Sequence, residues 1–313
     1  MLSTVTLIAP AGGKPLSAGT VETARAALID ASAAVSETLW LAADEACDLA
    51  VDGLTPAQAD AVMAPFARTH GLDQFSQAGP PDAPERRKRL LVADMDSTIV
   101  TSETLDELSD HAGIKDAIAA ITARAMNGEL GFEEALRERV GMIAGLSADA
   151  MQECWAGVEY TPGARELVGT MRAHGGYCVL VSGGFDFFTA RVAGEIGFHE
   201  EQANRLEIAG NKVTGTVLDP IVGREAKLAA LERHAERLGI TPDLAIAVGD
   251  GANDLQMIQA AGLGVAFHAK PVVAADAKAR VERGDLSALL FAQGYRREEF
   301  RRYEERAAAE TGC

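Results

Sequence analysis

The stretch Leu90-Leu91-Val92-Ala93-Asp94-Met95-Asp96-Ser97-Thr98 joins a continuous apolar run to a pair of carboxylates. Apolar runs without alternation are typical of parallel strands that are buried on both faces. A carboxylate in the position of Asp94 can attack a phosphoryl group, and one in the position of Asp96 can exchange protons with the leaving oxygen and with water. The structural alternative is an aspartate-rich strand end that only caps the next turn.

Three further apolar runs follow along the chain, at residues 177–181, 244–248 and 264–267. The first two end at polar residues, Ser182 and Gly249-Asp250. Helical stretches separate the runs, which favours an α/β fold with a Rossmann-like parallel sheet as its core. Ligands of such sheets bind at the carboxyl ends of the strands, so these polar residues predict one common site.

Two insertions interrupt this core. Residues 104–146 are rich in helix formers and too long for a simple crossover, so we expect an inserted helical cap over about 104–160. Residues 206–217 alternate around Gly210-Asn211, which predicts a small β-hairpin insertion. The core domain is therefore expected over residues 89–295. The charged segment 296–313 is expected to be a solvated helix or a frayed end.

The first 78 residues predict a separate α/β unit. A strand is expected at 5–8, helices at 21–34 and 56–70, and a last strand at 73–77. With two short strands inside residues 38–51, the order β-α-β-β-α-β is that of ferredoxin-like folds. Residues 79–88 begin with a proline-rich break and predict a linker.

Composition narrows the function classes. Of the 313 residues, 48% are apolar and 24% are charged, which is typical of a soluble protein with a hydrophobic core. The net charge of −17 argues against nucleic acid as a partner. No apolar run reaches the roughly 18 to 20 residues of a membrane span, and no signal peptide is expected at the start. Four scattered cysteines favour the cytoplasm and argue against a disulfide framework or a zinc site.

Three further motifs are ambiguous when each is taken alone. Asp250-Gly251-Ala252-Asn253-Asp254 offers carboxylates for a Mg²⁺ site, but such residues also make ordinary polar turns. Ser182-Gly183-Gly184 can cradle a phosphate with a hydroxyl and backbone N–H groups, or can simply turn the chain. Lys227 is a suitable point charge for a phosphate, although most lysines on helices are solvated.

The order of these motifs along the chain favours the functional interpretation of each motif over the structural one. A carboxylate pair, a serine, a lysine and an acidic loop, spread over about residues 86–295, resemble the four motifs of the haloacid dehalogenase superfamily of phosphohydrolases. The resemblance implies a Rossmann-like core, Mg²⁺ as cofactor and a phosphoaspartate intermediate on Asp94. Dehalogenases of that superfamily lack the second aspartate of the first motif, so Asp96 favours phosphatase chemistry.

The resemblance also implies a role for each residue. Asp94 and Asp96 would be catalytic, and Mg²⁺ would be held by the Asp94 carboxylate, the Asp96 backbone carbonyl and Asp250. Asp254 would orient the metal site or the lysine. The phosphate would be bound by Ser182, Gly183, Lys227 and Asn253.

The match extends to the phosphoserine phosphatase family, whose first motif continues as D-x-D-S-T with a glutamate where Glu103 stands. Arg139 fits that family's cap arginine, and Met126 and Phe132 resemble its apolar cap residues. A carboxylate at Glu103 can pair with the substrate's ammonium group, and Arg139 can bind its carboxylate with two hydrogen bonds. The resemblance implies hydrolysis of O-phospho-L-serine to L-serine and phosphate, the last step of serine biosynthesis.

Several alternatives stay open. The same fold and chemistry also serve other small phosphomonoesters, or phosphoryl transfer onto an alcohol. A third hypothesis is an amino-acid-sensing protein whose core domain no longer catalyses a reaction. Residues 1–78 weakly resemble ACT-like regulatory modules, which bind amino acids and pair across dimers, so a homodimer and a docking unit without ligand are both open.

Overall fold

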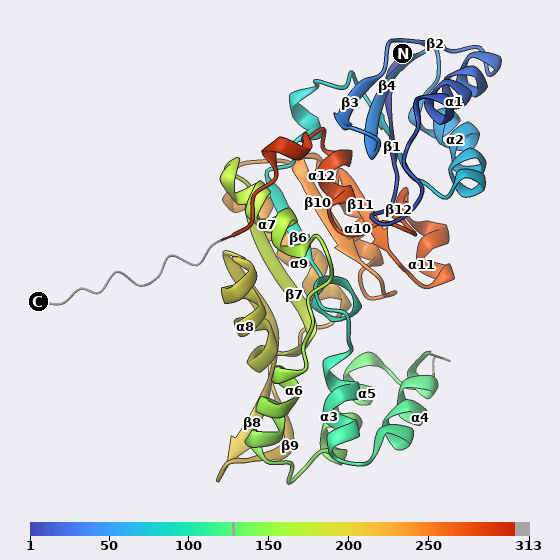
Figure 1. The fold of residues 1–313 in the computed structure, drawn as a ribbon. Coiled ribbons are helices and arrows are strands. Elements are labelled where there is room, and N and C mark those ends of the chain that lie inside the picture. The colour runs from blue at the N-terminus through green and yellow to red at the C-terminus, as the bar shows by residue number, and fades with distance from the viewer. Residues whose placement is uncertain (127–128, 304–313) are drawn as a thin grey trace, which may run out of the picture.

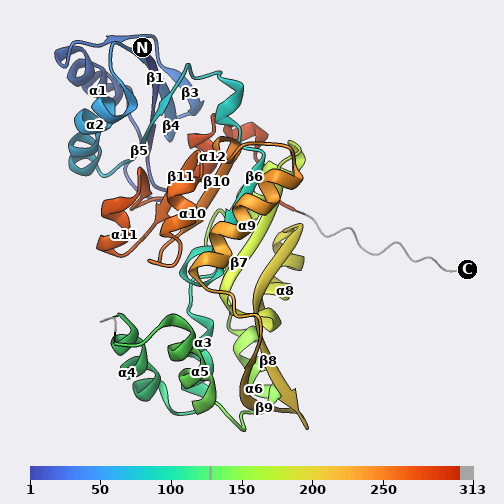
Figure 2. The ribbon, with the colours of Figure 1, turned by 180° about the vertical axis from the view of Figure 1, so that it is seen from behind.

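Three parts of the molecule are visible in the computed structural model, which describes residues 1–126 and 129–303, the side chain of Met126 excepted. An N-terminal unit and a helical cap lie at opposite ends of a layered core that is built on a parallel sheet (Figures 1 and 2). The predicted α/β class, with a Rossmann-like sheet, a cap, a hairpin and an additional N-terminal α/β unit, is confirmed.

The N-terminal unit is an antiparallel sheet in the order β2-β4-β1-β5, with β3 paired to β4 and two helices packed on one face. Thr55 and Gln58 form a capping box at the start of the second helix. The helix expected at 21–34 lies earlier because Ser17 accepts a hydrogen bond from Thr20 N and caps it there. The elements are β1 Leu2–Ile8, α1 Ala18–Asp30, β2 Ala34–Val35, β3 Leu39–Ala42, β4 Ala46–Asp52, α2 Pro56–His70 and β5 Asp73–Ala78.

The core sheet has the order β12-β11-β10-β6-β7-β8-β9 and is parallel except for the pair β8–β9. One face packs against α7, α8 and α12, and the other against α9 and α10. The strands are β6 Leu90–Ala93, β7 Tyr177–Phe185, β8 Glu200–Ala209, β9 Lys212–Leu218, β10 Ala245–Gly249, β11 Leu263–Phe267 and β12 Ala279–Val281. The helices are α7 Ala164–Ala173, α8 Asp186–Ile196, α9 Arg224–Arg237, α10 Leu255–Ala260, α11 Pro271–Asp276 and α12 Ala288–Ala292.

The register of this sheet brings the predicted strand ends together. Ala93 at the end of β6 lies beside Leu180 of β7 on one side and Val248 of β10 on the other. Asp94 continues the ladder, because its N–H donates to Val248 O at 3.0 Å. The residues that follow these three strands therefore meet at one edge of the sheet.

The cap leaves the core after β6 and returns before α7. Its two connections run side by side, with Thr161 N donating to Ile99 O at 3.0 Å and Val100 bridged to Tyr160. The β8–β9 hairpin packs under the cap and shares backbone hydrogen bonds with it, such as Gly145 N to Val213 O at 2.8 Å. The cap helices are α3 Thr104–His111, α4 Lys115–Met126, α5 Phe132–Met142 and α6 Ala148–Ala156.

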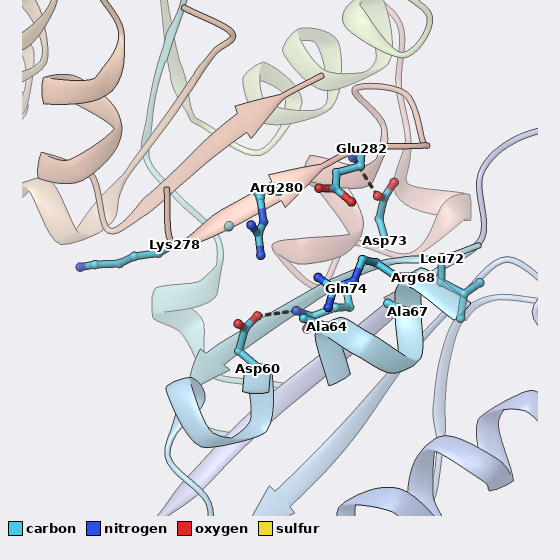
Figure 3. A pocket seen from close by; sticks show the side chains of 11 residues that line it. Asp60, Ala64, Ala67, Arg68, Leu72, Asp73, Gln74, Lys278, Arg280 and Glu282 are labelled. Atoms are coloured by element: carbon cyan, nitrogen blue, oxygen red, sulfur yellow. Dashed lines mark hydrogen bonds between the residues drawn. The ribbon is translucent and has the colours of Figure 1, made fainter. Parts of the chain in front are cut away.

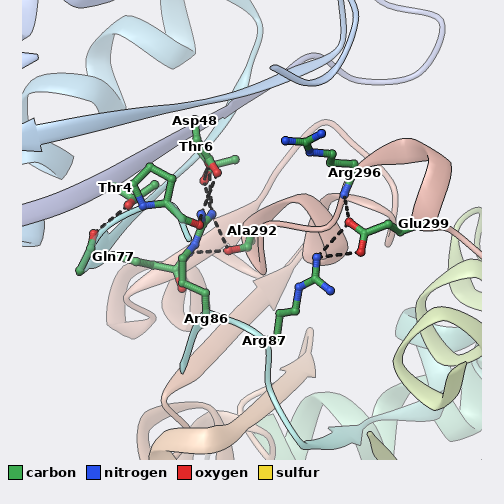
Figure 4. Close-up of polar contacts among 11 residues, drawn as sticks. Thr4, Thr6, Asp48, Gln77, Arg86, Arg87, Ala292, Arg296 and Glu299 are labelled. Atoms are coloured by element: carbon green, nitrogen blue, oxygen red, sulfur yellow. Dashed lines mark hydrogen bonds and ion pairs between the residues drawn. The ribbon is translucent and has the colours of Figure 1, made fainter. Parts of the chain in front are cut away.

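The predicted linker is part of a buried interface between the N-terminal unit and the core. Arg86, which ends the short helix η1 Pro84–Arg86, is only 3% exposed. Its guanidinium donates to both oxygens of Asp48 at 2.7 and 3.1 Å and to Ala292 O at 3.2 Å (Figure 4). Apolar residues of the N-terminal unit, among them Phe75, belong to the same hydrophobic cluster as the core sheet.

The charged C-terminal segment differs from the prediction. Residues 296–303 contain one short 3-10 turn, Arg297–Glu299, and contact the core through paired groups, so this range is neither a helix nor a frayed end. Arg296, Arg297, Glu298, Arg301 and Arg302 are nevertheless exposed, as expected for a solvated segment. Arg87 pairs with Glu299 at 2.8 Å, and Arg301 N donates to Thr170 Oγ1 at 2.8 Å. The sequence pattern missed this because charged residues are expected to be solvated, whereas here they pair across segments. Residues 304–313 lie outside the described part of the chain.

Two remaining expectations concern membranes and cysteines. Within residues 1–126 and 129–303, no helix is long and apolar enough to span a bilayer. Cys47, Cys154 and Cys178 are free, buried thiols.

Candidate active site

Asp94 occupies the centre of the site, directly after β6. Its side chain is almost completely buried, at 5% exposure. One oxygen, Oδ1, accepts hydrogen bonds from Met95 N at 2.8 Å and from Lys227 Nζ at 2.7 Å. The carboxylate is therefore held in one orientation by a backbone donor and a cation.

Lys227 lies on α9 and is buried between two carboxylates. Its ammonium is 2.7 Å from Asp94 Oδ1 and 2.5 Å from Asp254 Oδ1. Burial alone would lower the pKa of Lys227, but Asp254 and Asp94 outweigh burial and raise that pKa above its usual range. The other oxygen of Asp254 accepts a hydrogen bond from Gly251 N at 3.0 Å. Asp254 thus ties the lysine to the acidic loop and fixes its direction.

Asp96 is placed to exchange protons. Its Oδ1 accepts a hydrogen bond from Thr104 N at 3.0 Å, and its Oδ2 faces the hydroxyl of Ser182 at 3.3 Å. Burial first, and the negative charge of Glu103 second, raise the pKa of Asp96 to about 7. A carboxyl that titrates near neutral pH can serve both as acid and as base.

The acidic residues form a cluster that suits a hard divalent cation. One carboxylate oxygen each of Asp94, Asp250 and Asp254 lie within 4.8 Å of one another. Burial, followed by repulsion from Asp94, raises the pKa of Asp250 to about 6. Asp254 uses both of its oxygens to hold Lys227 and Gly251 N, whereas among the described residues Asp94 Oδ2 and the Asp250 carboxylate have no hydrogen-bond partner. Asp94 and Asp250 are therefore the carboxylates that best fit Mg²⁺, which prefers one or two carboxylates with water and phosphate oxygens.

The loop after β7 supplies the predicted phosphate cradle. Ser182 is fully buried, and its Oγ accepts a hydrogen bond from Gly184 N at 2.9 Å. Asn204 of β8, which the sequence did not point to, holds this loop by donating to Gly183 O at 2.8 Å. Asn253 is half-buried beside Gly251, where a side chain on the glycine would collide with the amide oxygen.

The cap places an aromatic ring over this cradle. Phe132 begins α5 and is 38% exposed. The ring lies so close to Gly183 and Gly223 that a Cβ at these positions would stand 3.4 and 3.2 Å from it. Met126, the other predicted cap residue, ends α4, and its side chain lies outside the described part of the molecule.

Two charged residues of the cap side, Glu103 and Arg139, lie close enough for the charge of one to act on the other. Glu103 is exposed and accepts a hydrogen bond from Ser97 Oγ at 2.7 Å. Arg139 is half-buried, and its Nε donates to Ala135 O at 3.2 Å. Burial lowers the pKa of Arg139, while the charges of Asp106 and Glu103 oppose that shift. Asp106 is a neighbour of this pair that sequence reasoning did not include.

The structure therefore brings Asp94, Asp96, Ser182, Lys227, Asp250 and Asp254 into one connected set, and places Phe132, Glu103 and Arg139 on its cap side. Sequence patterns missed Thr104 and Asn204, which hold Asp96 and the loop after β7, and Asp106, whose charge acts on Arg139. Thr104 follows Glu103 directly, so its proximity to the motif was visible. Asn204 lies in a strand with no motif, and only tertiary contacts reveal it.

Comparison with known proteins agrees with this geometry. The family model of haloacid dehalogenase-like hydrolases matches residues 91–259, more than half of the 313 residues. A phosphoserine phosphatase of Streptomyces coelicolor is 41% identical over 254 residues, which cover 81% of this chain and 62% of that protein. The chain spans about 52–63% of the length of several such curated relatives.

Solved structures extend the comparison to the whole fold. A probable phosphoserine phosphatase of Vibrio cholerae, in unliganded form, has a TM-score of 0.72 and 32% identity, covering 93% of this chain and 88% of that chain. A phosphoserine phosphatase that carries an analogue of a phospho-aspartyl intermediate has a TM-score of 0.61 and 37% identity, covering 65% of this chain and 98% of that chain. The chain belongs to the haloacid dehalogenase-like hydrolase family and, within it, to the phosphoserine phosphatases.

Proposed function

We propose that the protein hydrolyses O-phospho-L-serine to L-serine and phosphate through a phosphoaspartate on Asp94. The observation that carries the proposal is the arrangement of Asp94 between Lys227 and the acidic loop, with Asp96 beside it as a carboxyl whose pKa is raised to about 7. The relative with a phospho-aspartyl intermediate analogue supports the same chemistry.

In the first step, Asp94 attacks phosphorus and the bond from phosphorus to the serine oxygen breaks. Met95 N–H and Lys227 hold Oδ1 of the nucleophile, so Oδ2 is the oxygen presented for attack. Asp96, protonated near neutral pH, gives its proton to the departing serine oxygen. The product remaining on the protein is an aspartyl phosphate.

In the second step, the Asp96 carboxylate takes a proton from water, whose oxygen attacks phosphorus. The bond to Asp94 breaks, which restores both carboxyl groups and releases phosphate. Ser182 and Lys227 hold the phosphoryl oxygens through both steps. Mg²⁺, held by Asp94, Asp250 and the backbone carbonyl of Asp96, would neutralise charge on the phosphoryl group.

Selectivity for phosphoserine comes from the cap side of the site. Glu103 would pair with the ammonium group of the substrate, and Arg139 with its carboxylate. Phe132 covers the cradle and reduces the access of bulk water to the first step. Asn253 would complete the phosphate contacts, and Met126 would add apolar surface to the cap.

The biological setting follows from the same proposal. Release of serine from its phosphate would be the last step of serine biosynthesis, in the cytoplasm. The excess of acidic residues argues against nucleic acid as a partner. A second copy of the chain, paired through residues 1–78, is the partner that the ACT-like resemblance suggests.

Phosphate release from O-phospho-L-serine, measured with and without Mg²⁺, tests the function. Sugar and nucleotide phosphates provide the comparison substrates. We expect Mg²⁺-dependent turnover that prefers phosphoserine and disappears in Asp94→Asn. A different preferred phosphate would contradict the substrate, and the absence of turnover on every substrate would contradict the enzymatic function.

The cap variants Glu103→Gln and Arg139→Ala separate substrate recognition from chemistry. Each should raise KM for phosphoserine by about tenfold to a hundredfold, because a hydrogen bond to a charged group contributes about 1.5–3 kcal/mol. Turnover of p-nitrophenyl phosphate, which has neither an ammonium group nor a carboxylate, should change far less. Equal losses on both substrates would mean that these side chains do not read the amino acid.

A further inference from the structure

Asp73, the first residue of β5, reaches from the N-terminal unit into the core. It is 4% exposed, and its Oδ1 accepts hydrogen bonds from Glu282 N at 2.8 Å and Arg283 N at 3.2 Å. Its Oδ2 accepts a hydrogen bond from Gly284 N at 2.6 Å. Figure 3 shows the carboxylate beside Glu282, at a small cavity between α2, β5 and β12.

Three successive backbone N–H groups that converge on one anion form a nest. Here residues 282–284 of the core supply the nest, and Asp73 of the N-terminal unit supplies the anion. The nest lies in the loop that follows β12, the last strand at that edge of the core sheet. The conformation of this loop is therefore set by a residue from the other unit.

The same loop holds His268, which lies at the end of β11. Gly284 O accepts a hydrogen bond from His268 Nε2 at 2.8 Å, and His268 N donates to Val281 O at 2.8 Å. The backbone φ of His268 is 43°, in the left-handed region that few non-glycine residues adopt. Such a conformation persists only where the surroundings fix it, and the contact with Gly284 is one of the interactions that do so.

From His268 the chain reaches the acidic loop within two residues. Lys270 N is directed at Asp250 O, at 3.4 Å, and the Lys270 charge opposes the rise in the pKa of the Asp250 carboxyl. Lys270 also precedes Pro271, where α11 begins. Residues 268–270 therefore border Asp250, one of the two residues whose carboxylates best fit the metal, through its backbone carbonyl. On their far side they are anchored by the loop that Asp73 holds.

We propose that Asp73 is a positioning residue for residues 268–270, and that it acts on Asp250 through Gly284 and His268. By keeping this segment in one conformation, the N-terminal unit reduces the ordering that cation binding at Asp250 requires. We call this series of contacts, from Asp73 through Gly284 and His268 to Asp250, the route. Only the phosphate-release measurement rests on the proposed function, whereas the hydrogen-exchange measurement tests the route itself.

Hydrogen–deuterium exchange of the full-length protein, with and without Mg²⁺, measures the conformation of residues 263–273 directly. Asp73→Asn keeps the size of the side chain but removes its charge and one acceptor. We expect faster exchange of the amides of 268–270 in this variant. Exchange that rises only in residues 70–80 and 282–284, with 263–273 unchanged, would overturn the proposal.

Two matched controls separate the route from general loosening of the interface. Gln77→Ala removes another contact of β5 with the core, the 2.7 Å hydrogen bond to Ala292 O. Arg283→Ala changes the side chain of the nest loop and keeps its backbone N–H. Neither should change exchange at 268–270. If both accelerate it as much as Asp73→Asn does, the proposal fails.

Phosphate release from phosphoserine gives the functional readout. In Asp73→Asn, the Mg²⁺ concentration for half-maximal rate should rise about threefold to tenfold, within the range of measured couplings between distant residues. The rate at saturating Mg²⁺ should change less. An unchanged Mg²⁺ dependence would overturn the functional part. If the wild-type protein releases no phosphate, the proposed function fails, while the exchange measurement still decides this inference.

Combination of variants tests whether Asp73 acts through His268. His268→Asn tolerates the left-handed backbone and removes the ring contact to Gly284 O. Its effect on the Mg²⁺ dependence should be non-additive with that of Asp73→Asn, because both break one route. Full additivity would overturn the route.

A second variant covers the case in which Asp73→Asn does not fold. In Gly284→Ala, the new Cβ would stand 3.0 Å from Asp73 Oδ2, which disturbs the same contact while leaving the carboxylate in place. The same rise in exchange at 268–270 is expected. No rise there in a folded Gly284→Ala protein would count against the route.

Discussion

The active site and the interface between the units both bury charged side chains, but they balance the charge differently. At the interface, burial raises the pKa of Asp48 and Asp73 above the usual range, and the partners of each residue offset only part of that rise. At the active site, burial and neighbouring carboxylates act in the same direction and raise the pKa of Asp96 and Asp250 together. Lys227 is the buried cation that faces this cluster.

The difference separates stability from function. The interface carboxylates find their hydrogen-bond and charge partners within the protein. Asp48 pairs with the Arg86 guanidinium, and Asp73 accepts hydrogen bonds from three backbone N–H groups. The active-site carboxylates carry more negative charge than one lysine neutralises. Such an excess destabilises the free protein and favours the binding of an added cation.

The largest expected effect is that of Lys227→Met, which removes the buried cation from the active site. Two carboxylates, Asp94 and Asp254, would then remain buried and unpaired. We expect a loss of about 3–5 kcal/mol in the free energy of unfolding without Mg²⁺, and at least about a hundredfold loss in kcat. Urea denaturation and phosphate release measure the two effects.

Lys227→Arg serves as the control because it keeps the charge but changes its shape. It should preserve most of the stability and lose much of the activity. A Met variant as stable as the wild type would show that the cluster does not depend on its lysine.

Arg86→Met removes the cation that pairs with a buried carboxylate at the interface. It leaves Asp48 buried without its cation, so we expect a loss of about 3–5 kcal/mol in the free energy of unfolding. The activity of the folded fraction should stay unchanged, because the partners of Arg86 belong neither to the active site nor to the loop 282–284 that Asp73 holds. Denaturation curves and the kcat of the folded protein test this. Adding Asp48→Leu should restore part of the stability, and a further large loss would contradict the pairing argument.

Asp250→Asn should stabilise the protein in the absence of Mg²⁺. The pKa of Asp250 rises from 3.8 to about 6 on folding, so its contribution to stability is present at low pH and is lost as the pH rises through about 6. At pH 8 the variant should exceed the wild type by up to about 3 kcal/mol in the free energy of unfolding, and at pH 4 by much less.

Urea denaturation with a chelator at the two pH values measures this difference, with the exposed Asp82→Asn as a control that should show none. A variant less stable than the wild type at pH 8 would contradict the excess of negative charge. Phosphatase activity should be lost in Asp250→Asn. The same substitution would then raise the free energy of unfolding and abolish activity.

The smallest expected effect is a shift in the pH profile. Asp96 must be protonated for the first step, so kcat/KM should fall as the pH rises through about 7. The charge of Glu103 helps to raise this pKa, and Glu103→Gln should therefore move the descending limb to lower pH. Titration of the substrate's own phosphate is common to both proteins and cancels in the comparison. A limb that stays in place would assign it to another group.

Local pattern was sufficient to predict the catalytic edge of the sheet. The runs at 90–93 and 264–267 are apolar on both faces and became β6 and β11. The Gly210-Asn211 turn predicted the hairpin for a similarly local reason. These features depend on residues that are close in sequence, so they could be predicted without knowledge of the fold.

The interface could not be predicted in the same way. Arg86 stands in a polar, proline-rich stretch that is typical of a solvated linker, and its burial depends on Asp48, 38 residues away in sequence. The strand β12 is only three residues long and gives no clear pattern. The charged residues 296–303 likewise gain their partners from distant segments.

The apolar cluster that runs from the N-terminal unit into the core sheet has a consequence for unfolding. Ile8, Leu41 and Phe75 share that cluster with strands β6 and β7, so separating the units would expose apolar surface on both, although the N-terminal unit also has a cluster of its own. The proline- and glycine-rich stretch near residue 79 therefore separates the two units in the sequence, but we expect the units to unfold together. Calorimetry should record a single heat-absorption peak for the whole molecule, rather than one for each unit.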